Sequence, residues 1–386
     1  MPETGAGAAI EPFTIAVPQS ELDDLHERLR RTRWPDAETS HDWNQGAPLA
    51  KVRELCAYWL DRYDWRRCER QLNAVPQFKT VIDGLGVHFL HIRSPEPNAL
   101  PLIMTHGWPG SVIEFMKVAG PLTDPAAHGG DRADAFHLVL PSIPGYGFSD
   151  KPTEVGWGVD KVAAVWGELM RRLGYARWVA QGGDWGSVIT RRIGQLQPEG
   201  CIGIHVNMAP AIASPEDPKA ELTPAEKRFR EKARYYWDWD SGYAKQQSTR
   251  PQTLGYGLND SPVGQAAWIY EKLQSWTDND GAVENLLSMD EMLDNIMLYW
   301  LTGTATSSGR LYWESLGRSI SDGTVTMPAG FSLFPGDILL ASRETVEKTF
   351  TNMIHWNLVE RGGHFAAWEQ PELFTREVRD CFRRIR

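Results

Sequence analysis

Short apolar runs alternate with amphipathic stretches between residues 76 and 210, and this alternation limits the folds open to the chain. Apolar runs bounded by turn signals indicate buried strands, whereas apolar residues at helical spacing indicate helices. We predict strands at 78–82, 87–92, 100–105, 136–140, 178–181 and 201–206, and helices at 158–173 and 187–196. Because strands that alternate with helices form parallel sheets, we predict an α/β fold with a mostly parallel central sheet. A site in such a sheet lies at the carboxyl ends of the strands.

The flanking regions differ from this pattern and divide the chain into four predicted units. Two amphipathic helices are expected at 20–33 and 49–63, and the first follows a Ser20 cap. Helix formers and aromatic residues dominate from 211 to 320, and strand patterns return at 331–334 and 353–359. We therefore expect an N-terminal segment at 1–75, a first core part at 76–210, a helical lid at 211–324 and a second core part at 325–386.

Composition excludes several classes of function. The net charge is −10 and no dense Lys/Arg block is present, which argues against a nucleic-acid partner. The four cysteines form no C-x-x-C pair, and no metal-binding or nucleotide-binding motif is found, so neither a metal nor a cofactor is expected. No signal peptide or membrane span is visible, and we expect a cytoplasmic protein without membrane contact. The sequence is compatible with a homodimer.

The segment Gly182-Gly183-Asp184-Trp185-Gly186 lies between a predicted strand and a predicted helix. This is the pattern of a nucleophile elbow, with Asp184 where serine often stands. Aspartate also commonly caps helices, so capping is the alternative interpretation. A carboxylate is ionised at pH 7 and can displace a group at an sp³ carbon to form an ester. The pattern therefore favours epoxides or alkyl halides as substrates over peptides.

Other strand ends supply partners for such a nucleophile. The backbone N–H groups of Trp108, in HGWPGS, and of Trp185 are candidates for an oxyanion hole. His364, in RGGHF, is the candidate base that activates water, and Asp337 is the candidate acid that orients it. The chain order of nucleophile, acid and histidine is typical of α/β-hydrolases.

Opening an epoxide also requires a proton donor for the departing oxygen. A tyrosine stays protonated at pH 7 and can donate. The residues of the lid region alone do not decide between the candidates, which are Tyr235, Tyr236, Tyr243, Tyr256, Tyr270, Tyr299 and Tyr312.

With these motifs the chain resembles the microsomal-type epoxide hydrolases, including their soluble bacterial members and insect juvenile-hormone relatives. The resemblance rests on HGWPGS at 106–111, GGDWGS at 182–187, SPVG at 261–264, RGGHFAAWE at 361–369 and the N-terminal stretch from 13 to 35. It implies an α/β-hydrolase fold in which the N-terminal segment wraps the hydrolase domain. It also implies proton donation by Tyr243, in Ser-Gly-Tyr, and by Tyr312, in Arg-x-Tyr-x-Glu. The charge-relay acid of the family can be glutamate, and Asp337 occupies the matching position here.

The expected reaction is conversion of a small-molecule epoxide and water to a vicinal diol, through an Asp184 ester that His364-activated water hydrolyses. Its physiological setting would be detoxification or natural-product biosynthesis. A haloalkane dehalogenase is the closest alternative, because it uses the same kind of nucleophile and a tryptophan such as Trp185 can contact halide. A catalytically silent hydrolase-fold binding protein is the alternative from a different class.

Overall fold

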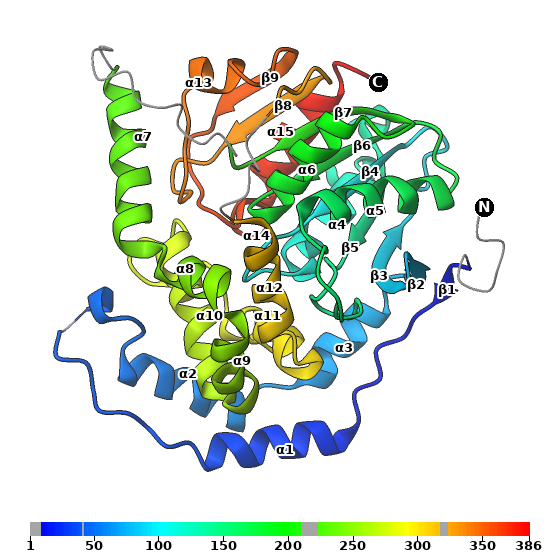
Figure 1. Cartoon of the computed structure of the whole chain (residues 1–386). Helices are drawn as coiled ribbons and strands as arrows, with labels where there is room; N and C mark the ends of the chain where they lie inside the picture. Colours follow the sequence, from blue (N-terminus) through cyan, green and yellow to red (C-terminus); the bar gives the residue numbers. More distant parts are fainter. Residues whose placement is uncertain (1–8, 41, 210–222, 317–322) are drawn as a thin grey trace.

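The computed structural model describes residues 9–40, 42–209, 223–316 and 323–386. Within these residues, nine strands form one sheet in the order β1-β2-β3-β5-β4-β6-β7-β8-β9 (Figure 1). The strands are β1 (Glu11–Pro12), β2 (Gln77–Ile82), β3 (Leu85–Ile92), β4 (Leu100–Thr105), β5 (Phe136–Pro141), β6 (Trp178–Gly182), β7 (Cys201–Val206), β8 (Ala329–Leu333) and β9 (Met353–Leu358). All pairs from β5 to β9 in this order are parallel, and the pairs from β1 to β5 are antiparallel. The predicted mostly parallel sheet is confirmed.

The hairpin between β2 and β3 illustrates how local sequence sets the sheet. Ile82 pairs with Leu85 across a turn whose two central residues, Asp83 and Gly84, have φ of 49° and 79°. Positive φ at both central positions is what a two-residue turn of type I′ requires, and Asp-Gly is a preferred pair there. The Asp83-Gly84 pair therefore accounts for the hairpin between the strands predicted at 78–82 and 87–92.

Helices cover both faces of the sheet. On one face α5 (Val159–Arg172) packs against α6 (Trp185–Leu196), and on the other α4 (Met116–Thr123) packs against α14 (Ala366–Glu369) and α15 (Pro371–Phe382). The central strands β4, β5 and β6 are buried along their whole length, as expected for a sheet covered on both sides. The short helix α13 (Arg343–Glu347) lies between β8 and β9 in the chain. None of the described helices has both the length and the apolar character needed to cross a bilayer.

A second group of helices lies beside the sheet and includes the predicted lid (Figure 1). It contains α7 (Pro224–Tyr235), the π-helix η5 (Tyr236–Asp240), α8 (Gly242–Thr249), α9 (Pro251–Asp260), α10 (Pro262–Trp276), α11 (Met289–Thr302) and α12 (Ala305–Ser315). Residues 211–222 and 317–322 of the predicted lid lie outside the described residues. The boundaries of the four units stay predictions.

The N-terminal helices pack on these lid helices, although they precede the sheet in the chain. They are α1 (Gln19–Arg30), α2 (Leu49–Asp61) and α3 (Trp65–Asn73), and they contact α10 and α11 (Figure 1). The predicted Ser20 cap is wrong, because Pro18 precedes the first turn and Ser20 lies inside it. Sequence analysis missed α3, whose buried face is formed by Trp65, Cys68 and Leu72 and is too short for clear periodicity.

Candidate active site

Asp184 lies in a sharp turn at the carboxyl end of β6, directly before α6. Its φ of 50° is in the left-handed region that non-glycine residues rarely adopt. The turn is crowded: a Cβ on Gly182 would lie 2.1 Å from the Gly186 carbonyl oxygen, and one on Gly186 would lie 1.9 Å from that of Thr105. Asp184 holds the N-cap position of α6 but its side chain makes no capping hydrogen bond. The carboxylate is therefore available for another role, and the capping interpretation is wrong.

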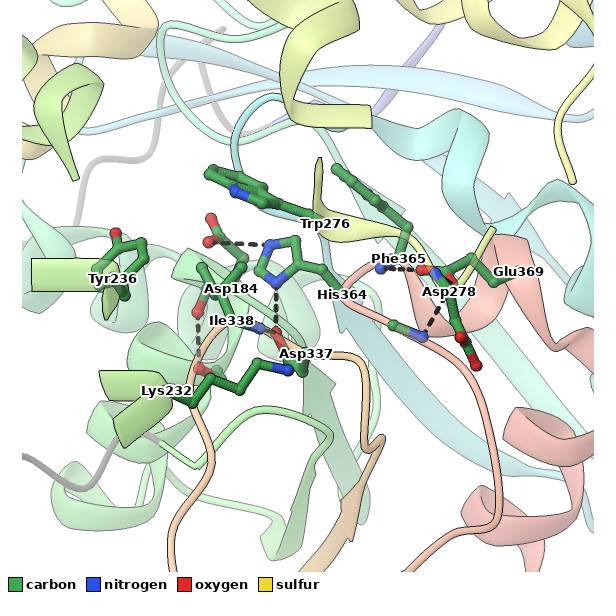
Figure 2. A network of polar contacts seen from close by, with 12 residues as sticks. Asp184, Lys232, Tyr236, Trp276, Asp278, Asp337, Ile338, His364, Phe365 and Glu369 are labelled. Atoms are coloured by element: carbon green, nitrogen blue, oxygen red, sulfur yellow. Dashed lines mark hydrogen bonds and ion pairs between the residues drawn. The ribbon is translucent and has the colours of Figure 1, made fainter. Parts of the chain in front are cut away.

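Three loops bring Asp184, His364 and Asp337 together, from the ends of β6, β9 and β8 (Figure 2). His364 Nδ1 lies 2.7 Å from Asp337 Oδ1, and His364 Nε2 lies 3.2 Å from Asp184 Oδ2. The Ile338 backbone N–H donates to the same Asp337 oxygen at 2.6 Å. Asp337 and the His364 ring are buried. The structure thus brings all three residues into the arrangement that the chain order predicts.

The two carboxylates control the charge of the His364 ring. Burial by itself would lower the pKa of His364, but the carboxylates of Asp337 and Asp184 outweigh it and raise this pKa well above its usual value. The imidazolium is therefore the favoured form while both carboxylates are ionised.

The loop after β4 supplies a hydrogen-bond donor to the Asp184 carboxylate. The Trp108 backbone N–H donates to Asp184 Oδ1 at 2.8 Å. Trp185 is the first residue of α6, and its ring meets Tyr312 edge-on with centroids 4.8 Å apart. An N–H that already holds one carboxylate oxygen is suitably placed to stabilise charge on that oxygen during a reaction. The contribution of the Trp185 N–H stays a prediction.

Tyr243 and Tyr312 lie close together from α8 and α12, with ring centroids 5.8 Å apart. Tyr243 stacks on the Trp108 ring at 4.8 Å, and burial raises the pKa of both phenols well above its usual value. The phenols are therefore protonated and can donate. Tyr312 Oη has no hydrogen-bond partner among the described residues.

The structure also sorts the remaining tyrosines. The hydroxyl of Tyr236 lies 2.9 Å from that of Tyr243. Tyr236 therefore lies beside Tyr243 and Tyr312, although the sequence did not distinguish it from the other candidate tyrosines. Tyr270 donates to Glu284 and Tyr299 to the Gly110 carbonyl, while Tyr235 and Tyr256 are exposed.

Glu369 holds the loop that carries His364, a role that the sequence analysis missed. Its carboxylate accepts the backbone N–H groups of Asp278, Gly363 and Phe365 at 2.9, 2.8 and 2.8 Å (Figure 2). Burial raises the pKa of Glu369 to about 7, although these donors act in the opposite direction. Its position within the RGGHFAAWE motif is the one signal that pointed to it. Across the described ranges, no three His, Cys, Asp or Glu side chains are grouped to hold a metal ion.

Comparison with known proteins agrees with this site. Residues 10–115 match the family model of the epoxide hydrolase N terminus, and residues 101–244 match that of the alpha/beta hydrolase fold. A relative from Stigmatella aurantiaca (strain DW4/3-1), provisionally named an epoxide hydrolase, is 56% identical over 377 residues, which cover 98% of this chain and 86% of the relative. Epoxide hydrolase 1 of Sus scrofa is 37% identical over 98% of this chain and 89% of its own. The crystal structure of juvenile hormone epoxide hydrolase from the silkworm Bombyx mori superposes with a TM-score of 0.90 at 30% identity, covering 97% of this chain and 94% of that chain.

The chain therefore belongs to the epoxide hydrolase family, whose members here share the α/β-hydrolase fold. It is a hydrolase that acts on epoxides, as the sequence predicts. The comparisons favour this activity over the haloalkane dehalogenase alternative and over a silent binding protein.

Proposed function

We propose that this enzyme converts a small-molecule epoxide to a vicinal diol through a covalent ester on Asp184. One observation carries the proposal: the two carboxylate oxygens of Asp184 have different partners. Oδ1 accepts the Trp108 N–H at 2.8 Å, and Oδ2 faces His364 Nε2 at 3.2 Å. This division suits Oδ2 to attack the substrate and Oδ1 to carry negative charge later in the cycle.

The first step is opening of the ring. Tyr243 and Tyr312 donate hydrogen bonds to the epoxide oxygen. Asp184 Oδ2 forms a bond to one ring carbon while the bond between that carbon and the epoxide oxygen breaks. A proton passes from one tyrosine to the departing oxygen, leaving a tyrosinate and an alkyl ester. A general acid of this kind contributes on the order of 10² to 10⁴ in rate.

Ester formation changes the charge around His364. The Asp184 carboxylate becomes neutral, so one of the two charges that raise the pKa of His364 disappears. The imidazolium then loses its proton more readily, and the tyrosinate made in the same step can take it. Neutral His364, held by Asp337, is a base ready to accept a proton from water.

The second step is hydrolysis of the ester. Water gives a proton to His364 and attacks Cγ of Asp184, and the Trp108 and Trp185 N–H groups stabilise the oxyanion on Oδ1. The Cγ–Oδ2 bond breaks, so Oδ2 leaves as a hydroxyl of the diol with a proton from His364. The new carboxylic acid returns its proton to His364, which restores the starting charges.

The proposal is tested by mixing the His364→Gln variant with styrene oxide and recording the mass of the intact protein. Loss of the base should block ester hydrolysis while Asp184 still attacks. We expect a mass gain of one epoxide that maps to Asp184 and is absent when Asp184→Asn is added. Diol formation by the wild type together with no adduct on His364→Gln would contradict the covalent route.

A further inference from the structure

A small cavity lies against Asp184 and His364. It leaves about 10 Å³ for the centre of a water molecule, which is room for about one water. Its polar walls are the side chains of Asp184, His364, Glu114 and Asn207, and most of the remaining lining is glycine, alanine or phenylalanine. Ordered water in a protein needs two to four polar partners, and this cavity offers that number.

The cavity does not extend to the residues that would hold the epoxide oxygen. Its described lining comes from the loops after β4, β6, β7 and β9 and the helices that follow, and it includes neither Tyr243 nor Tyr312. Water placed here therefore has contact with both the nucleophile and the base without competing with the epoxide for the tyrosines.

Glu114 lies in the short helix η2 (Val112–Phe115), which follows the loop that carries the Trp108 N–H. Its carboxyl group folds back over Gly110: a Cβ at Gly110 would come within 1.4 Å of Glu114 Oε1. The backbone N–H of Ser111 and the charge of His364 act to lower the pKa of Glu114, and the charges of Asp184 and Glu369 act to raise it. Burial raises the pKa of Glu114 to about 8. The carboxyl group is thus mostly neutral at pH 7, although it lies beside the most reactive groups of the site.

We infer that a carboxyl oxygen of Glu114 accepts a hydrogen bond from the water that hydrolyses the Asp184 ester, and holds that water in this cavity. The inference rests on the proposed function, because it assigns a residue to its second step. The water directs one O–H to His364 Nε2 and the other to Glu114, which leaves a lone pair for Cγ of Asp184. A neutral acceptor orients the water without adding negative charge beside the oxyanion on Oδ1.

The experiment separates the two chemical steps in single turnovers of styrene oxide, with the ester followed by rapid quench and intact mass. Glu114→Leu removes the acceptor oxygen and keeps the size of the side chain. We expect ester formation within about 2-fold of wild type, and hydrolysis slowed on the order of 10- to 100-fold, so that ester accumulates. Unchanged hydrolysis would overturn the inference, and so would equal slowing of both steps, which indicates a purely structural role.

Glu114→Gln is the matched control, because its amide keeps a carbonyl acceptor without an ionisable group. We expect it to hydrolyse the ester within about 3-fold of wild type. Hydrolysis as slow as in Glu114→Leu would exclude a neutral acceptor role and overturn the inference.

Gly110→Ala provides a second route that leaves the chemistry of Glu114 intact. The added methyl would displace the Glu114 carboxyl group, because the three atoms nearest to it all belong to the Glu114 side chain and Oε1 is the nearest. Slower hydrolysis with normal ester formation is expected, and this variant decides the question if Glu114→Leu does not fold. The same change should have no further effect on hydrolysis in the Glu114→Leu background, because the group that it displaces is gone.

His364→Gln, run in parallel, separates the two proposals. If it forms no ester, the proposed function fails. If it traps the ester while Glu114→Leu hydrolyses at the wild-type rate, only the role of Glu114 fails.

Discussion

The backbone of Asp184 and the hydroxyl of Tyr312 are both held in unfavourable states by the fold. Asp184 adopts a φ of 50°, which costs on the order of 1–3 kcal/mol and orients the carboxylate away from helix capping. Tyr312 is buried with no partner for its hydroxyl in the described part of the chain, which is also unfavourable. The Asp184 carboxylate is thus not used to cap the helix and the Tyr312 hydroxyl is left unpaired, at a cost that the surrounding packing offsets.

The two tyrosines should respond differently to removal of the hydroxyl. Tyr243→Phe breaks the hydrogen bond to Tyr236 and should destabilise the fold by about 1–2 kcal/mol, whereas Tyr312→Phe should cost nothing or stabilise it slightly. Both should slow ester formation by on the order of 10²-fold, since in the proposed mechanism each phenol donates to the epoxide oxygen. Urea denaturation and rapid-quench kinetics measure the two effects. Equal destabilisation by both changes would contradict the difference in partners.

At the level of elements, helix α11 holds the loop that carries the Trp108 N–H. Asn295 Nδ2 donates to the Pro109 carbonyl at 2.7 Å, and Ser111 Oγ donates to Asn295 Oδ1 at 2.7 Å. One turn further along α11, Tyr299 donates to the Gly110 carbonyl at 2.7 Å. Positions four apart lie on the same face of a helix, so one face of α11 satisfies the polar groups of this loop. Hydrogen bonds from α11 therefore fix the position of the loop that carries the Trp108 N–H.

Asn295→Leu should be more damaging than Tyr299→Phe. The first change removes two buried hydrogen bonds at nearly constant volume and should cost about 2–4 kcal/mol, while the second removes one and should cost about 1–2 kcal/mol. Because the Trp108 N–H would lose its support, ester hydrolysis should also slow in Asn295→Leu. Urea denaturation and single-turnover kinetics test both statements. A smaller loss of stability for Asn295→Leu than for Tyr299→Phe would argue against this account.

At the scale of the whole molecule, the N-terminal helices pack against the helices of the predicted lid. Asp294 on α11 accepts hydrogen bonds from Tyr63 at 2.8 Å and from Arg67 at 2.6 Å. Both donors lie more than 200 residues earlier in the chain. Burial raises the pKa of Asp294, although Arg67 and Tyr63 oppose this effect. A buried carboxylate depends strongly on such partners. The position of α11, and with it that of the loop carrying the Trp108 N–H, thus depends on the N-terminal segment.

Removal of the Arg67 guanidinium should lower the free energy of unfolding by an amount that depends on pH. Arg67→Met leaves Asp294 without its ion-pair partner and should cost about 2–3 kcal/mol at pH 7.5, below the usual range because Arg67 is partly exposed. The pKa of Asp294 should rise further above its unfolded value. The folded state then binds the proton more tightly than the unfolded state, so stability is greatest at low pH and falls as pH rises through the folded pKa.

In urea denaturation, the free energy of unfolding that Arg67→Met loses relative to the wild type should therefore be smaller at pH 5 than at pH 7.5. Adding Asp294→Asn, which removes the charge, is the control and should recover part of the loss at pH 7.5 and abolish its pH dependence. A deficit that grows on acidification would contradict this interpretation.

Much of this site is predictable from the sequence because its parts are local. The elbow at 182–186 is a run of consecutive residues between a strand and a helix, so its pattern is visible without the fold, as is that of the Asp83-Gly84 turn outside the site. Chain order then pointed to His364 and Asp337, since strand ends in a parallel sheet meet at one edge. The resemblance to a family was needed to choose Tyr243 and Tyr312.

Other features were decided only by tertiary packing. The free Tyr312 hydroxyl and the Glu114 carboxyl beside His364 follow from contacts between segments up to 250 residues apart. No periodicity or motif encodes such distances, because they depend on how the lid, the N-terminal helices and the sheet pack together. The local sequence therefore determined the Asp184 elbow, and the packed core decided which other side chains reach the Asp184 carboxylate.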